Sequence, residues 1–377
     1  MRPAAVALTG LAALAAAIGI GRFAFTPILP MMQEDAGVSV TAGGWLAAAN
    51  YVGYLLGALS IVWLRIPAAT AIRVGLLTIG VVTIGMGLVA GFVSWAALRG
   101  LAGVASAWVL INASAWCLER LAPLRSPLLN GTVFAGVGVG IALTGAVCLG
   151  LMSVHASAAR AWIVIGAIAL VLAAGIWGAF GVGDRHPSRD TDAHRRRRAW
   201  GRGWTRLVLC YGAFGFGYII PATFLPLMAK QVIRNPAVFG WSWPVFGAAA
   251  AVSAVALGLL PRTTNRRAWI VGHLLMACGI ALPAIWPGIL AIMGAALAVG
   301  GTFMVITMVG LQEAREAGGA HATRLMAAIT AAFGLGQILG PLLVSALAGH
   351  GRGFSPALLI AAFVLVISAY ALSRAER

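Results

Sequence analysis

The chain has 377 residues, of which 61% are hydrophobic and only 9% are charged. Soluble globular proteins carry roughly 25% charged residues, so this chain has too few polar groups to cover a water-facing surface. The composition excludes a soluble enzyme, a secreted domain and a disordered protein, and it favours a polytopic membrane protein. One helical span needs about 20 apolar residues, so with short loops the length holds about twelve spans.

Apolar runs separated by polar, proline or glycine breaks predict the membrane helices. In chain order the predicted spans are 6–31, 42–64, 71–92, 94–119, 129–152, 160–181, 205–229, 241–260, 268–286, 288–312, 325–348 and 355–373. The first run follows Arg2 and continues through Leu29 without a clear cleavage site, so we interpret it as a membrane helix and not as a signal peptide. Closed β-barrels are excluded because the runs are continuous and do not alternate.

Basic residues outnumber acidic ones by 26 to 9, a formal net charge of +17. We interpret this excess by the rule that cytoplasmic loops collect Lys and Arg, and we expect no nucleic-acid partner. The predicted spans place 20 of the 26 basic residues on the side of both termini and four on the other side, with Arg22 and Arg99 inside spans. The sequence therefore predicts a multi-pass protein of the inner (cytoplasmic) membrane with both termini in the cytoplasm.

A long hydrophilic stretch divides the spans into two sets of six. It runs from Gly183 to Gly203 and contains four consecutive arginines, Arg195 to Arg198. We predict an N-terminal six-helix bundle over 1–181, a cytoplasmic linker over 182–204 and a C-terminal six-helix bundle over 205–377. The linker is interpreted as a solvated connection, and a site for anionic lipid head groups is the alternative.

The two predicted bundles repeat each other in sequence. Gly19-Ile20-Gly21-Arg22 matches Gly215-Phe216-Gly217-Tyr218 at an offset of 215 − 19 = 196, and Gly44-Trp45 matches Gly240-Trp241 at the same offset. Two parallel six-helix repeats are typical of one class of secondary transporter, in which the substrate binds between the halves near the middle of the membrane. The fold class predicted is an all-α membrane protein with twelve transmembrane helices in two pseudo-symmetric bundles.

With this repeat, the chain resembles the major facilitator superfamily along its whole length. The stretches Gly19 to Pro27 and Phe333 to Pro341 are similar to the YbfB/YjiJ-type branch. The resemblance implies transport by alternating access and a cavity lined by spans one, four, seven and ten. Ile61 stands where the superfamily's loop motif has Asp, which argues against the usual gate between a carboxylate and a helix dipole. Span five lacks the antiporter-type proline, which weakens a drug/proton antiporter assignment.

Arg22 is the most informative single residue. An arginine at the centre of a membrane helix costs about 2.5–3.5 kcal/mol on insertion scales, so it must face water or a partner. We expect its guanidinium to bind an anionic group, with bonding to local carbonyls or snorkelling to the interface as the alternatives. Tyr218 occupies the equivalent repeat position and is expected to flank the same site, whereas Arg99 is expected either to face the cavity or to snorkel outward.

The predicted substrate-binding set comprises polar and aromatic residues of the cavity-lining spans and their neighbours: Arg22, Phe23, Thr26, Tyr51, Tyr54, Arg99, Asn112, Tyr211, Tyr218, Thr223, Thr302, Thr307 and Gln337. A cytoplasmic ion-pair gate is predicted from Glu119, Arg120, Glu313 and Arg315, because an acidic and a basic residue recur at the inner ends of spans four and ten.

No acidic residue falls in the middle of a predicted span. Transport would then be coupled to protons either through an acidic residue at the inner gate or through protonation of the substrate itself. The third possibility is a facilitator, which moves the solute without a coupling ion. We predict a secondary active transporter of a small organic solute, with an anionic or zwitterionic solute as the main candidate and a multidrug/proton antiporter as the alternative. The expected partners are the solute, membrane lipids and, as a candidate coupling ion, the proton. We expect a monomer that is not an enzyme and needs no cofactor and no metal, because no cluster of His, Asp or Cys is visible.

Overall fold

The computed structural model describes residues 1–64, 66–124, 126–180, 202–233, 235–257, 264–350 and 353–374. All regular elements in these ranges are helices, and twelve segments are long and apolar enough to cross a membrane. The helices are α1 (Pro3–Leu14), a π-helical segment η1 (Ala15–Ile20), α2 (Phe25–Ala36), α3 (Val40–Leu64), α4 (Ala68–Leu88), α5 (Phe92–Leu121), α6 (Pro127–Ser153), α7 (Ala158–Ile176), α8 (Arg202–Val232), α9 (Pro236–Phe239), α10 (Ser242–Ala256), α11 (Asn265–Ile285), α12 (Ile289–Gly318), α13 (Ala322–Gly349) and α14 (Ser355–Ser373).

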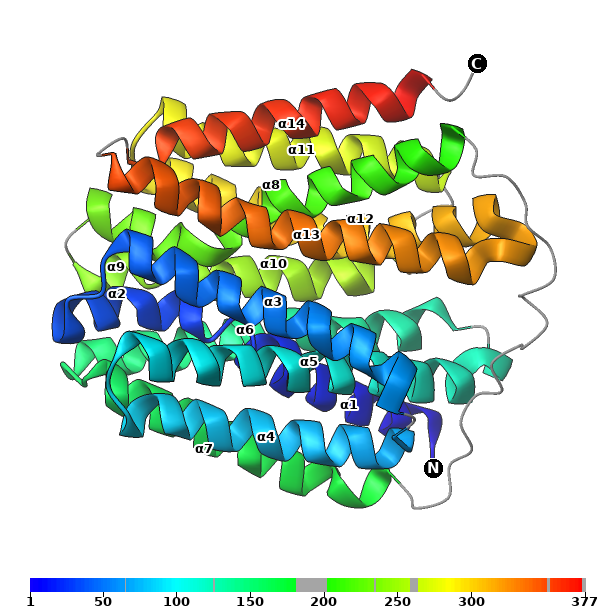
Figure 1. Ribbon diagram of the computed structural model, residues 1–377, viewed down its shortest axis with the longest axis horizontal. Helices are drawn as coiled ribbons and strands as arrows, with labels where there is room; N and C mark the ends of the chain where they lie inside the picture. Colours follow the sequence, from blue (N-terminus) through cyan, green and yellow to red (C-terminus); the bar gives the residue numbers. More distant parts are fainter. Residues whose placement is uncertain are drawn as a thin grey trace.

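The helices of the first half, α1 to α7, lie together on one side of the molecule, and α8 to α14 lie on the other (Figure 1). The beginning of α1 and the end of α14 lie at the same end of the molecule (Figure 1). This arrangement confirms the predicted all-α membrane fold with twelve spans in two bundles. The domain boundaries stay a prediction, since residues 181–201, which hold most of the predicted linker, lie outside the described residues.

The first span is broken near its middle. Between α1 and α2 the backbone widens into a π-helical segment, in which the Gly21 amide donates to the Ala16 carbonyl at 3.0 Å and the Phe23 amide donates to the Ile18 carbonyl at 3.1 Å. Wide turns of this kind release carbonyl groups from the regular ladder, and a membrane interior tolerates them only where other protein groups satisfy them. The break therefore marks a place where this helix needs polar neighbours.

The two bundles meet backbone to backbone where α6 crosses α10. A Cβ atom placed on Gly138 would lie 2.6 Å from the Gly247 carbonyl oxygen, and one placed on Gly247 would lie 2.7 Å from the Gly138 oxygen. Only glycine at these two positions lets the helices approach so closely, which is how small residues join membrane helices. On the opposite side of the interface, α3 and α13 are joined by hydrogen bonds of the Thr41 and Ser345 hydroxyls to each other's backbone carbonyl at 3.3 and 3.1 Å.

Repeat-equivalent residues pair where α2 crosses α8. The Thr26 hydroxyl donates to the Ala222 carbonyl at 2.8 Å, and Glu34 forms an ion pair with Lys230 at 2.7 Å. Both pairs are separated by the repeat offset, since 222 − 26 = 196 and 230 − 34 = 196. Residues that the repeat relates can meet only near the approximate two-fold axis, so the axis between the halves runs along the α2–α8 crossing. The ion pair lies near the last turns of both helices, at the end opposite the termini.

Candidate functional site

Arg22 lies in the break of the first span and is buried between the two bundles, with 4% of its surface exposed. Its Nη2 donates to the Gln337 side-chain oxygen on α13 at 2.9 Å. Its guanidinium carbon lies 4.3 Å from the ring centroid of Tyr54, 5.1 Å from that of Tyr51 and 5.5 Å from that of Phe23. The side chain thus points inward, and its observed partners are a neutral amide and three aromatic faces.

A chain of hydrogen bonds continues from Arg22 into the second half. The Gln337 amide donates to the Tyr218 hydroxyl on α8, so Arg22 and its repeat equivalent Tyr218 are linked through one shared side chain. Nearby, the Tyr51 and Thr223 hydroxyls are hydrogen-bonded at 3.0 Å. The Arg22–Gln337 and Tyr51–Thr223 contacts cross from one bundle to the other, so the cluster depends on the two halves being close together.

Arg99 holds the backbone of the break in place. Its side chain is 2% exposed and donates to the carbonyls of Gly21 at 3.5 Å and Arg22 at 3.0 Å. The Asn50 amide donates to the carbonyls of Gly21 at 3.2 Å and Arg99 at 2.8 Å. Arg99 therefore does not extend to the membrane interface, and its bonded N–H groups satisfy carbonyls that the broken helix leaves free. Charge-assisted hydrogen bonds of this kind fix geometry strongly.

Arg22 lacks a compensating negative charge among the residues described. The acidic side chains in these ranges are Glu34, Asp35, Glu119, Glu313 and Glu316, and all five lie near helix ends. The Nε atoms of Arg22 and Arg99 are both buried without a hydrogen-bond partner in the same ranges. A buried charge normally pairs with an opposite charge or makes its full set of hydrogen bonds, so the cluster has capacity for an additional acceptor.

The structure gathers nine of the thirteen predicted binding residues into this cluster: Arg22, Phe23, Thr26, Tyr51, Tyr54, Arg99, Tyr218, Thr223 and Gln337. Tyr211 lies beside it, with its ring centroid 5.4 Å from that of Phe333. Asn112, Thr302 and Thr307 instead donate to backbone carbonyls three or four residues earlier in their own helices. These bonds use one donor of each side chain within its own helix, and a binding role for the three residues stays a prediction.

The four residues of the predicted gate have different contacts in the structure. Glu313 pairs with Arg266 on α11 at 2.6 Å and not with Arg315. The reason is geometric, since residues two apart lie on different faces of a helix. On α5, the Arg120 guanidinium lies 4.2 Å from the ring centroid of Trp116, and Glu119 is exposed. The Glu313–Arg266 contact lies within one bundle, and a gating role for the four predicted residues stays a prediction.

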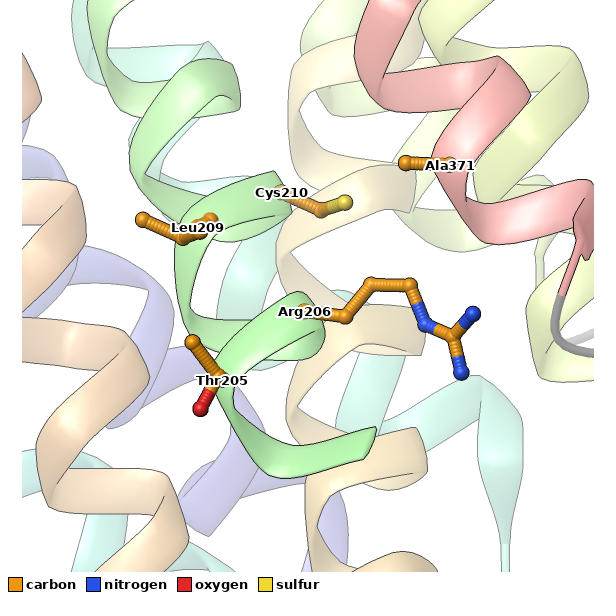
Figure 2. Close-up of a pocket in the computed structure, with 5 residues that line it drawn as sticks. All are labelled: Thr205, Arg206, Leu209, Cys210 and Ala371. Carbon is orange, nitrogen blue, oxygen red and sulfur yellow. The ribbon is translucent and has the colours of Figure 1, made fainter. Parts of the chain in front are cut away.

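A separate pocket of about 300 Å³ opens at the beginning of α8, away from the cluster. Figure 2 shows Thr205, Arg206, Leu209 and Cys210 of α8 beside Ala371 of α14. It is lined by the second half alone, so it has no part in contacts between the bundles. Its lining contains one charged side chain, Arg206, whereas the Arg22 cluster joins both bundles.

Sequence reasoning missed two features of the interface. One is the Glu34–Lys230 ion pair. The two positions are related by the repeat offset of 196, so the sequence could have indicated this pair. The other is the set of aromatic rings around Tyr218, in which Phe303 and Phe333 lie nearly parallel to the tyrosine ring, at interplanar angles of 2° and 8°. Aromatic residues in apolar spans give no sequence signal that separates a site from a packed core.

Two bundles that meet around a polar cluster between broken and glycine-rich helices define a membrane transporter of the major facilitator type. The family model described as "Uncharacterised MFS-type transporter YbfB" matches residues 14–373, nearly the whole chain. The chain belongs to this family, in agreement with the resemblance found in the sequence. None of the curated proteins matches the chain.

Proposed function

We propose that the protein is a secondary active transporter that carries a small organic anion across the cytoplasmic membrane. The single observation behind this proposal is Arg22, a buried guanidinium between the two bundles without an ion-pair partner in the described ranges. A guanidinium stays charged in proteins and presents a fork of donors that fits a carboxylate. A bound anion would supply the missing negative charge and accept hydrogen bonds from Arg22.

Alternating access would follow from where the cluster lies. Arg22 and Tyr51 come from the first bundle, and Tyr218 and Gln337 from the second, so a solute bound among them contacts both bundles. Transporters built from two parallel repeats rock their bundles about such a site. The α6–α10 contact at Gly138 and Gly247 offers two smooth helix surfaces about which the bundles could turn.

The orientation we propose places both termini in the cytoplasm. The charge distribution supports it, because the spans predicted from the sequence place 20 of the 26 basic residues on the side of the termini and cytoplasmic loops collect Lys and Arg. In that orientation the Glu34–Lys230 ion pair lies at the outer end of the α2–α8 crossing and acts as an outer gate. Lys230 also donates to the Pro30 carbonyl at 2.9 Å, which fixes the lysine across the interface.

A thermal-shift screen on purified protein tests the proposal. It compares organic carboxylates, neutral sugars and lipophilic cations on the wild type, on Arg22→Gln and on Arg160→Gln, a matched control at an exposed arginine of α7 outside the cluster. A ligand at a hundredfold excess over its dissociation constant stabilises the native state by about 2.7 kcal/mol.

We expect stabilisation by carboxylates in the wild type and in Arg160→Gln, and its loss in Arg22→Gln. Stabilisation by lipophilic cations that is unchanged in Arg22→Gln would overturn the proposal and favour a drug-efflux carrier.

A further inference from the structure

The aromatic contacts of Arg22 restrict the direction from which an anion can reach it. The rings of Phe23, Tyr51 and Tyr54 lie 4.3–5.5 Å from the guanidinium carbon and pack against it. Bidentate binding of a carboxylate uses donors in the plane of the guanidinium. One of these donors now bonds Gln337 at 2.9 Å. An incoming carboxylate therefore takes the position of the Gln337 oxygen, at the edge that faces the second bundle.

The groups beyond this edge are aromatic. Gln337 bonds the hydroxyl of Tyr218, whose ring lies parallel to Phe303 and Phe333 with centroid distances of 5.6 and 5.5 Å. Phe214 stacks on the same tyrosine at 5.1 Å. Phe333 is only half-buried, whereas Tyr218, Phe303 and Phe214 are buried. The body of an anion held by Arg22 would thus lie against stacked rings contributed by α8, α12 and α13.

The charges around the site limit the substrate to one carboxylate. Arg99, the other arginine inside the spans, already donates to the carbonyls of Gly21 and Arg22. Of the Arg99 guanidinium, only the buried Nε is left without a partner in the described ranges, so a second carboxylate near Arg22 would find no guanidinium fork that could bind it in bidentate fashion. An ammonium group would find no acidic partner, because the acids in the described ranges lie near helix ends. Desolvating an unpaired charge is costly, so the site disfavours dicarboxylates and zwitterionic amino acids.

From these three observations we infer that the substrate is a monocarboxylate with a flat, aromatic body, whose carboxylate binds Arg22 and whose ring packs against Phe333 and Tyr218. The inference rests on the proposed function, since it refines the kind of anion that the Arg22 site takes. Gln337 and the Tyr218 hydroxyl can then donate to the second carboxylate oxygen, so both act as specificity-determining residues.

Four probes test separately for an aromatic ring, for a single carboxylate and for the absence of an ammonium group: benzoate, cyclohexanecarboxylate, isophthalate and phenylalanine. Their dissociation constants are measured by titration calorimetry on the purified full-length protein. An aromatic pair contributes about 0.5–1.5 kcal/mol beyond its buried area, so we expect benzoate to bind about 2- to 12-fold more tightly than cyclohexanecarboxylate. Isophthalate and phenylalanine, each with one additional charge, are expected to bind at least about tenfold more weakly than benzoate.

Two variants locate the ring. Phe333→Leu removes the half-buried ring at the site, and Phe363→Leu is the matched control on α14, where the side chain is 65% exposed. We expect Phe333→Leu to reduce the preference for benzoate over cyclohexanecarboxylate to nearly onefold and Phe363→Leu to leave it unchanged. Equal binding of the two ring acids to the wild type, or tighter binding of isophthalate, would overturn this inference while anion binding at Arg22 stands. If none of the four carboxylates binds, the proposed function fails with it.

Discussion

The contact between Gly138 of α6 and Gly247 of α10 gives the sharpest prediction about how the bundles are joined. A Cβ atom on Gly138 would approach the Ala251 nitrogen and lie 2.6 Å from the Gly247 oxygen and 2.8 Å from the Ala251 Cα. These are backbone atoms, which cannot rotate away as a flexible side chain can. Gly138→Ala must therefore separate the two helices locally.

The expected cost follows from overpacking. Inserting one extra carbon into a well-packed interface costs typically about 1–3 kcal/mol. Alanine favours the helix over glycine by roughly 1 kcal/mol, which offsets part of this. Gly150→Ala is the matched control, because it lies in the same helix and a Cβ there meets nothing within 4 Å. We expect Gly138→Ala to be less stable than Gly150→Ala by about 1–3 kcal/mol.

Reversible unfolding in detergent–SDS mixtures measures this difference, and substrate uptake by proteoliposomes reports its effect on the moving interface. We expect slower uptake for Gly138→Ala and ordinary uptake for Gly150→Ala. If both variants unfold at the same SDS fraction, the α6–α10 helices do not touch at backbone level and the reasoning is refuted.

Three further predictions concern the ends and the break of the first span. Glu34→Gln removes the outer ion pair and should open the α2–α8 crossing, so a cysteine introduced by Thr223→Cys should be alkylated faster. The double variant Glu34→Lys with Lys230→Glu restores the pair in reverse and should return the alkylation rate to that of Thr223→Cys alone. Equal alkylation rates in all these variants would exclude a gate at this ion pair. Arg99→Gln should abolish stabilisation by carboxylates although Arg22 remains, because the backbone carbonyls of Gly21 and Arg22 lose the guanidinium that holds them in place. Stabilisation equal to that of the wild type in the thermal-shift screen would show that Arg99 does not position Arg22. Asn50→Leu removes two buried hydrogen bonds and should lower the free energy of unfolding by about 1–3 kcal/mol, measured by SDS unfolding, whereas an unchanged value would mean that Asn50 does not hold the break.

The fold could be predicted from the sequence because the membrane imposes simple rules on it. Length and apolarity define the spans, and the offset of 196 relates the two halves. The same repeat pointed to Arg22 and Tyr218 as neighbours, and the structure links them through Gln337. This step succeeded because residues on an approximate two-fold axis meet their own equivalents.

The remaining contacts depend on side-chain rotamers and on which helix packs opposite. The spacing of residues along the sequence specifies neither of them. Arg99 could have faced a cavity or the interface, but its donors are bonded to carbonyls that only the three-dimensional break exposes. Glu313 has a basic residue two positions away, yet its partner is Arg266 on another helix. Thr302 and Thr307 lie on a cavity-lining span, and their hydroxyls bond their own helix. In each case a local pattern allowed several partners and the packing selected one.

The central claim is that Arg22 binds the transported anion. Counterflow into proteoliposomes tests it most directly, with the organic anion that stabilises the purified protein most strongly preloaded inside and the labelled anion added outside. We predict rapid accumulation in the wild type and in Arg160→Gln, and a loss of at least about tenfold in Arg22→Gln, since the charge-assisted hydrogen bonds to the carboxylate are worth about 1.5–3 kcal/mol. Accumulation in Arg22→Gln at the wild-type rate would contradict the account.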